Sequence, residues 1–237
     1  MAGRGQPGKR GDILRGALTV FARDGYVGAS IDAISAEASV STRTIYNHFQ
    51  DKAALFVTVV EESTARVAGI HGEIIERHLG REVFDVEGLE EVLVACAVDL
   101  ADPAGRDYGE HIALIRHLDA EAGSIPAEAV RIWRRTGPLR VQELLAGRLA
   151  EFGARGLLGG VGVGPGSGAG AAGDGSGAGP VAGAGAGLSA EAAGLAATHF
   201  LMLARGAVPF RRREGEAGIE DAVRAGVRVF LYGYARG

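Results

Sequence analysis

Apolar residues recur at one-turn spacing along most of the chain. The first such stripe consists of Ile13, Leu14, Ala17, Leu18 and Phe21. Apolar positions at i, i+3, i+4 and i+7 indicate the buried face of an amphipathic helix. Gly25 follows this stripe, and glycine often marks the end of a helix. A helix is therefore predicted from Asp12 to about Gly25.

Two short helices joined by a tight turn are predicted next. Ser30 is a favourable N-cap for a helix that ends near position 38, and Ser41 is one for a helix that runs through Phe49. A serine there accepts a hydrogen bond from a backbone N–H at the helix start. Asp51 is expected to cap a longer helix that reaches about position 78. Residues 1–60 are thus predicted to contain four helices.

The remaining apolar stripes have the same helical period. Further helices are predicted over residues 89–100, 111–122, 126–152, 189–205 and 219–234. No stretch shows the alternation of a half-buried strand. The expected fold is all-α with about nine helices. An N-terminal three-helix helix-turn-helix domain is expected over residues 12–58, and a C-terminal helical domain over residues 59–237.

Two segments lack this periodicity. Residues 1–11 are polar and basic and are expected to form a flexible arm, whereas 14 of the 29 residues from Gly159 to Gly187 are glycine. Such a tract buries too little apolar area to offset the entropy of ordering it, so a disordered loop between two helices is predicted. A tether or partner site and a tolerated insertion both remain open interpretations.

Composition and charge narrow the class of protein. Cys96 is the only cysteine, which excludes an intramolecular disulfide and fits a reducing, cytoplasmic location. No signal peptide or membrane span is expected. No enzyme motif is present, so neither catalysis nor a cofactor or metal is expected. The net charge is −4, and residues 1–56 carry seven basic and five acidic side chains. A basic end on an acidic body is compatible with a nucleic-acid partner.

The second short helix carries side chains suited to the DNA major groove, which admits one α-helix. Thr42, Arg43 and Asn47 are expected to point outward and read bases, because Arg pairs with guanine and Asn with adenine. Other side chains offer donors suited to phosphate oxygens. These are Thr44, Tyr46, His48 and Lys52.

The same region resembles the TetR family of bacterial repressors. The resemblance rests on the residues FARDGY at 21–26, Ser30–Ile31, Val40–Ser41, TIYNHFQDK at 44–52 and Leu55–Phe56. It implies an all-α homodimer with an N-terminal DNA-binding domain and a C-terminal domain for ligand binding and dimerisation. It also implies that Ser30 contacts phosphate, and that a basic arm with Arg4, Lys9 and Arg10 reaches an adjacent groove. Residues 111–138 loosely resemble AefR-like C-terminal domains of this family.

Two residues depart from the family pattern. Ser39 stands where the family usually has glycine in the turn, and Ser35 replaces the usual alanine where the helices cross. If the turn needs a positive φ, serine at position 39 is strained. Neither change removes a predicted DNA contact.

The resemblance further implies an effector pocket among the middle helices. Apolar side chains with a few polar groups suit a small, largely hydrophobic molecule, although ordinary core packing is the alternative for each residue. Cys96 is expected to be a buried structural thiol rather than a redox sensor. The candidate pocket residues are Ile74, His78, Cys96, Leu100, His111, Ile115 and Trp133.

The last two predicted helices each carry an apolar stripe suited to a two-fold dimer, which would imply a palindromic operator. An effector would then release a repressor by altering the spacing of its two recognition helices. The sequence leaves open a DNA-bound activator or an effector-independent DNA-binding protein. The candidate interface residues are Leu195, His199, Phe200, Leu203, Val227, Phe230, Leu231 and Tyr234.

Overall fold

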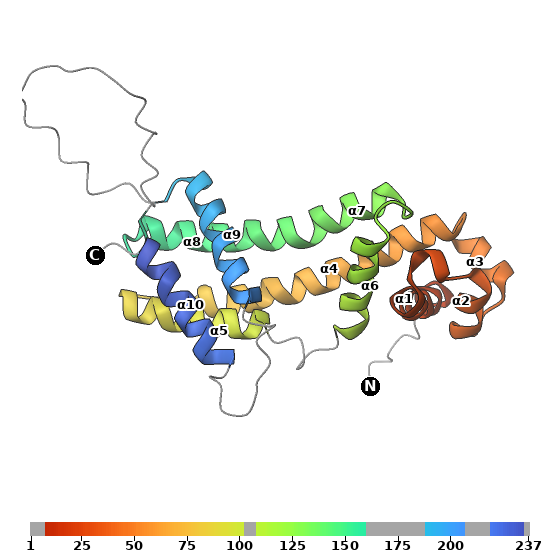
Figure 1. The fold of residues 1–237 in the computed structure, drawn as a ribbon, viewed down its shortest axis with the longest axis horizontal. Coiled ribbons are helices and arrows are strands. Elements are labelled where there is room, and N and C mark those ends of the chain that lie inside the picture. The colour runs from red at the N-terminus through yellow and green to blue at the C-terminus, as the bar shows by residue number, and fades with distance from the viewer. Residues whose placement is uncertain (1–7, 102–107, 160–187, 207–218, 235–237) are drawn as a thin grey trace, which may run out of the picture. The chain divides into compact units, whose positions relative to one another are not determined.

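The computed structural model describes residues 8–101, 108–159, 188–206 and 219–234, and within these ranges all regular structure is helical (Figure 1). The all-α prediction is therefore confirmed. The helices are α1 (Lys9–Gly28), α2 (Ile31–Glu37), α3 (Thr42–His48), α4 (Lys52–Leu79), α5 (Val86–Ala101), α6 (Gly109–Ala120), α7 (Ala127–Arg134), the π-helical η1 (Arg135–Leu139), α8 (Arg140–Ala154), α9 (Ala190–Gly206) and α10 (Ile219–Tyr234).

One predicted helix has an unexpected turn inside it. The segment expected as a single helix over residues 126–152 is continuous from Ala127 to Ala154, but Arg135–Leu139 form a π-helical turn that contains Pro138. Proline has no N–H to donate to a preceding carbonyl, and a wider turn is one way for a helix to accommodate it.

The chain divides into two compact units, and the division differs from the predicted boundary at residue 58. The first unit holds the described residues of 1–73 and 102–141, and the second holds those of 74–101 and 142–237. Helix α4 contributes to both units. The predicted loop over residues 159–187 lies outside the described residues except for Gly159.

The core of the first unit joins residues that are far apart in the sequence. Phe21 on α1 packs edge-on against Phe56 on α4, with ring centroids 4.9 Å apart. Ile45 on α3 and Phe49, which follows α3, belong to the same cluster. Leu114 and Leu118 on α6 complete it. Helices α1 to α3 therefore do not enclose their own core, because α6 supplies part of it.

Helix α1 differs from the prediction at both ends. It begins at Lys9, so residues 9–11 are helical rather than part of a flexible arm, whereas residues 1–7 lie outside the described ranges. At the other end the helix is kinked at Gly25 (φ 72°, ψ 178°) and continues to Gly28. Glycine alone adopts this backbone region readily.

The kink at Gly25 is held by a residue of the segment after α6. The Glu121 carboxylate accepts a hydrogen bond from the backbone N–H of Val27 at 2.9 Å, and its other oxygen lies 3.1 Å from His117 Nδ1. A Cβ on Gly25 would lie 1.9 Å from Glu121 Oε1. The glycine is therefore needed for space as well as for its backbone conformation.

The second unit is built around α5, α9 and α10. Phe200 on α9 packs against Phe230 on α10, and Phe230 stacks on Tyr234 at 4.7 Å. His78 at the end of α4 is 2.8 Å from Asp99 on α5. None of the helices within the described residues is long and apolar enough to cross a membrane.

Candidate functional site

A serine caps the start of each of the two short helices, α2 and α3. Ser30 Oγ accepts a hydrogen bond from Ala33 N at 3.1 Å, and Ser41 Oγ accepts one from Thr44 N at 3.1 Å. Both predicted caps are therefore confirmed. Because each cap uses the oxygen as an acceptor, the Ser30 hydroxyl keeps its hydrogen for another partner.

The turn between α2 and α3 contains a residue with positive φ, which is the condition under which serine at position 39 was expected to be strained. Ser39 has φ 54°, and among the described residues it is the one non-glycine with a positive φ. Its backbone N–H donates to Ala36 O at 3.2 Å. Gly16 on α1 lies so close to the turn that a Cβ there would be 2.8 Å from Ala38 N. The turn thus packs on α1 at a position without a side chain.

Helix α3 presents one buried face and one outward face. Ile45 is buried on α3, and Phe49, which follows its last residue, is buried beside it. At 100° per residue, Asn47 lies opposite this buried pair and Arg43 lies one turn before it. Both side chains are exposed. The sequence predicted this face, and the structure places the two side chains on it together.

The remaining predicted contacts flank that outward face. Tyr46 is 56% exposed, and His48 is also exposed. Thr42 and Thr44 are half-buried, and Thr44 Oγ1 lies 2.8 Å from Ser41 Oγ. Within the described residues Arg43 makes no ion pair. Its guanidinium therefore has donors available for an external acceptor.

Lys52 has an internal role that the sequence did not reveal. Its ammonium donates to Tyr26 O and Ala29 O, both at 2.9 Å, and lies 4.6 Å from the centre of the Tyr26 ring. An ammonium has three donors, so one remains for a phosphate. The structure therefore makes Lys52 mainly a tie between the start of α4 and the end of α1.

The basic residues before Asp12 are also placed differently from the prediction. Arg10 donates to Glu62 on α4 at 2.9 Å, and its guanidinium lies 5.5 Å above the Phe49 ring. Lys9 is exposed in the first turn of α1. Arg4 lies outside the described residues. Arg10 is thus held against the helical domain instead of extending as part of an arm.

The predicted effector residues are divided between the two units. Ile74, His78, Cys96 and Leu100 belong to the second unit, whereas His111, Ile115 and Trp133 belong to the first. Ile74 and Cys96 are fully buried. Burial raises the pKa of the Cys96 thiol to about 12, which agrees with an unreactive structural thiol.

Two histidines of this set have defined partners. His111 Nδ1 lies 2.9 Å from Ser63 Oγ, and burial together with the nearby Arg66 and His71 lowers the pKa of His111 to about 4. His78 Nε2 contacts Asp99, and its buried Nδ1 has no hydrogen-bond partner among the residues that the structure describes. The described residues contain no group of three or more metal-ligating side chains.

Most of the predicted dimer residues are buried within the single chain. The stripe on α10 packs on α5 and α9 of the same protomer, and Phe200 on α9 packs against Phe230, which corrects the prediction for four residues of α10 and one of α9. The apolar pattern predicted burial correctly but could not say which element covers the stripe. Leu195 and His199 are exposed, Leu203 is half-buried, and the corrected residues are Phe200, Val227, Phe230, Leu231 and Tyr234.

Other apolar side chains of α9 and α10 face outward. Met202 on α9 is 65% exposed, and on α10 Val229 is 69% and Tyr232 is 94% exposed. Leu195 lies two turns before Met202 on α9, and Val229 lies one turn before Tyr232 on α10, so each helix carries an exposed apolar pair. These four residues are called the exposed apolar face below. The predicted stripes included Leu195 but not Met202, Val229 or Tyr232.

Comparison with known proteins finds a family match for the region that contains most of α1 together with α2 and α3. Residues 13–59 match the family model described as bacterial regulatory proteins, tetR family. The transcriptional repressor AcnR of Corynebacterium glutamicum is 36% identical over 107 residues, which are 45% of this chain and 48% of that protein. The repressor NicS of Pseudomonas putida is 40% identical over 52 residues, which are 22% of this chain and 24% of that protein. The chain thus matches less than half the length of each.

Two solved structures extend the similarity of fold over almost the whole chain. A putative TetR-family regulator from Mesorhizobium loti has a TM-score of 0.66 with 24% identity, covering 96% of this chain and 97% of that one. The flavonoid-responsive regulator FrrA has a TM-score of 0.59 with 25% identity over the same shares.

Proposed function

We propose that this chain is a transcriptional repressor of the TetR family, whose model its residues 13–59 match. It binds a palindromic DNA operator as a homodimer and is released by a small effector. The observation that carries the proposal is the outward face of α3. It holds Arg43 and Asn47 one turn apart and opposite the buried Ile45.

The roles on α3 follow from chemistry and position. Arg43 donates two hydrogen bonds to a guanine edge, and Asn47 pairs with adenine. Thr42 lies beside this face as a third base contact. Ser30, Thr44, Tyr46 and His48 surround it with hydroxyl and imidazole groups that bind phosphates and set the orientation of α3 in the groove. Lys52 adds one remaining donor to this set.

Repression and release are supported by the named relatives. AcnR and NicS are both transcriptional repressors, and FrrA is described as flavonoid-responsive. An effector that binds the middle helices changes operator affinity by a coupling free energy, typically about 1–3 kcal/mol, and operator binding must weaken the effector by the same factor.

The exposed apolar face of α9 and α10 is the proposed dimer surface. Isolated exposed apolar residues are common, but Leu195, Met202, Val229 and Tyr232 lie on the two helices that pack against each other. In a two-fold dimer the same face would meet its own copy. Met202→Glu should therefore yield a monomer by light scattering, whereas Glu191→Gln, an exposed change on the same helix, should leave the dimer intact.

The operator is found by selecting bound duplexes from a random DNA library at fixed salt. The parent protein should enrich a palindrome, with half-sites about one helical turn or a multiple of it apart. Arg43→Ala should lose discrimination at one base pair of each half-site, at a cost of about 1–3 kcal/mol. Arg116→Ala is the matched control, because Arg116 is exposed on α6.

Each part of the proposal has its own contrary outcome. If no sequence is enriched by protein refolded from denaturant, which removes any bound small molecule, specific DNA binding is refuted. If Arg43→Ala selects the same sequence with the same information at every position, its base-reading role is refuted. An enriched site without internal symmetry would refute binding as a two-fold dimer.

A further inference from the structure

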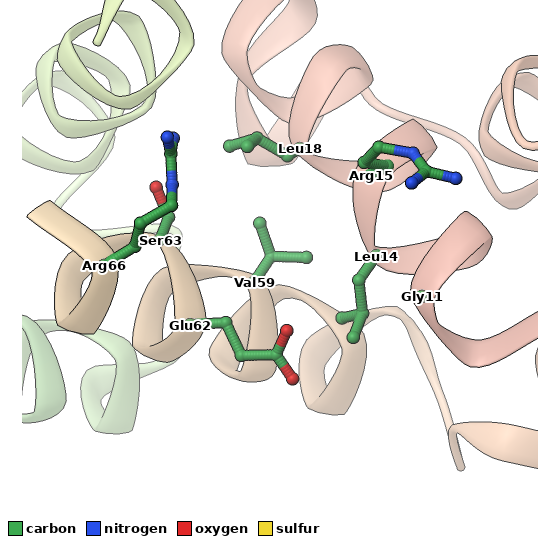
Figure 2. Close-up of a pocket in the computed structure, with 8 residues that line it drawn as sticks. All are labelled: Gly11, Leu14, Arg15, Leu18, Val59, Glu62, Ser63 and Arg66. Atoms are coloured by element: carbon green, nitrogen blue, oxygen red, sulfur yellow. The ribbon is translucent and has the colours of Figure 1, made fainter. Parts of the chain in front are cut away.

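A cavity lies between α1 and α4 within the first unit. It has a volume of about 180 Å³, and none of the residues that line it was predicted to bind the effector (Figure 2). Leu14 and Leu18 from α1 and Val59 from α4 form its apolar part. Ser63 and Arg66 lie side by side at one end, and Arg15 lies toward the other. The cavity thus combines an apolar surface with a polar end.

The charges around the cavity are not equally compensated. Arg15 is paired with Asp12, and Glu62 is paired with Arg10. In the part of the chain that the structure describes, Arg66 makes no ion pair, although Glu62 lies one helical turn before it. The polar end therefore carries a guanidinium whose positive charge is not neutralised by a carboxylate of the described residues.

Ser63 adds a second polar group next to Arg66. Its side chain is buried, and its Oγ lies 2.9 Å from His111 Nδ1. His111 is neutral at pH 7, because its pKa is lowered to about 4. In the tautomer that carries the proton on Nδ1, His111 donates to Ser63 Oγ, and the serine hydrogen is then available to a ligand.

We propose that this cavity binds a small monocarboxylate whose apolar part is about one ring in size, with the carboxylate on Arg66 and Ser63 and the ring against Leu14, Leu18 and Val59. A guanidinium binds a carboxylate in a fork geometry that a neutral amide cannot match. The volume suits this size, since an engineered apolar cavity of about 150 Å³ accommodates benzene. The bound molecule would bridge α1 to α4, in the unit that also holds α3.

Calorimetric titration with benzoate, and with benzamide as its neutral isostere, tests the proposal on the full chain without DNA. Benzoate should bind saturably with one site per chain, and benzamide should bind about tenfold more weakly. Because no operator is used, the result is independent of whether the DNA-binding proposal holds. Absence of saturable benzoate binding, or equal affinity for the two compounds, would overturn the proposal.

Two arginine variants test whether benzoate binds in this cavity. Arg66→Gln should weaken benzoate about tenfold and leave benzamide unchanged, because it removes the positive charge and leaves a shorter, neutral polar side chain. Arg66 is exposed, so the variant is expected to fold, and Trp133 fluorescence checks this. Arg116→Gln makes the same charge change away from the cavity and should have no effect. If both variants bind benzoate as the parent does, the assignment to this cavity is wrong.

Discussion

Replacing Gly25 with alanine tests how firmly the segment after α6 holds the kink in α1. The φ of 72° and ψ of 178° cost alanine about 1–3 kcal/mol in backbone strain. The added Cβ would lie 1.9 Å from Glu121 Oε1, so the carboxylate must move and lose its hydrogen bond with Val27 N. A bond of this kind is worth about 1–2 kcal/mol where water can partly replace it. Gly25→Ala should therefore destabilise the first unit by about 2–5 kcal/mol.

A double-mutant cycle with Glu121→Ala separates the two terms. In the Glu121→Ala background the collision is gone, so Gly25→Ala should cost only the strain of about 1–3 kcal/mol. The assay is urea unfolding at fixed protein concentration, followed by the fluorescence of Trp133. This residue is the single tryptophan of the chain and packs on the core cluster of the first unit.

Gly28→Ala is the matched control, because it lies three residues further along α1 and has only an ordinary contact at 3.6 Å. It should be neutral or should stabilise the helix, by up to about 1 kcal/mol. If Gly25→Ala costs the same with and without the Glu121 carboxylate, within about 0.5 kcal/mol, the proposed coupling between α1 and the segment after α6 is refuted.

Three further perturbations follow from the structure. Ser39→Gly should raise the free energy of unfolding by about 0.5–1 kcal/mol, because it relieves the positive φ at some entropic cost; a loss of stability in urea would mean that the serine side chain is needed. Lys52→Met should destabilise the protein by about 1–3 kcal/mol, because Tyr26 O and Ala29 O lose their donor; unchanged stability, with a salt dependence of DNA binding reduced by about one, would instead favour a purely phosphate-binding lysine. His111 has a pKa lowered to about 4, so the unfolded chain binds its proton first, and this histidine should lower stability as the pH falls from about 6.5 towards 4. His111→Asn should therefore lose less stability than the parent between pH 7 and pH 5, and equal losses would contradict the assignment.

The helices and the outward residues of α3 could be predicted because both depend on local rules. Ser30 and Ser41 act as the predicted caps, and the spacing of Ile45 and Phe49 fixes which side of α3 is buried. A positive φ at Ser39 was also considered, because the family that the region resembles usually has glycine at this position. These features need no knowledge of distant parts of the chain.

Sequence reasoning falls short where a side chain has a choice between partners. For Lys52 it missed the hydrogen bonds to two backbone carbonyls more than twenty residues earlier, and the phosphate contact stays a prediction. Phe230 and Tyr234 were expected at a dimer interface, but α5 and α9 bury the stripe to which they belong. Hydrophobic periodicity predicts that a face is covered, and only the tertiary arrangement determines what covers it.

The core that α1 to α4 share with α6 sets a condition for transferring the proposed DNA-binding helices to another regulator. An excised segment of residues 1–58 would leave Phe21 and Phe56 without Leu114 and Leu118, which belong to the same buried core cluster in the intact chain. It would also lack the Glu121 carboxylate that caps Val27. The transferable module is therefore discontinuous, and a chimera that is meant to keep this DNA specificity has to carry α6 and the start of α7 together with α1 to α4.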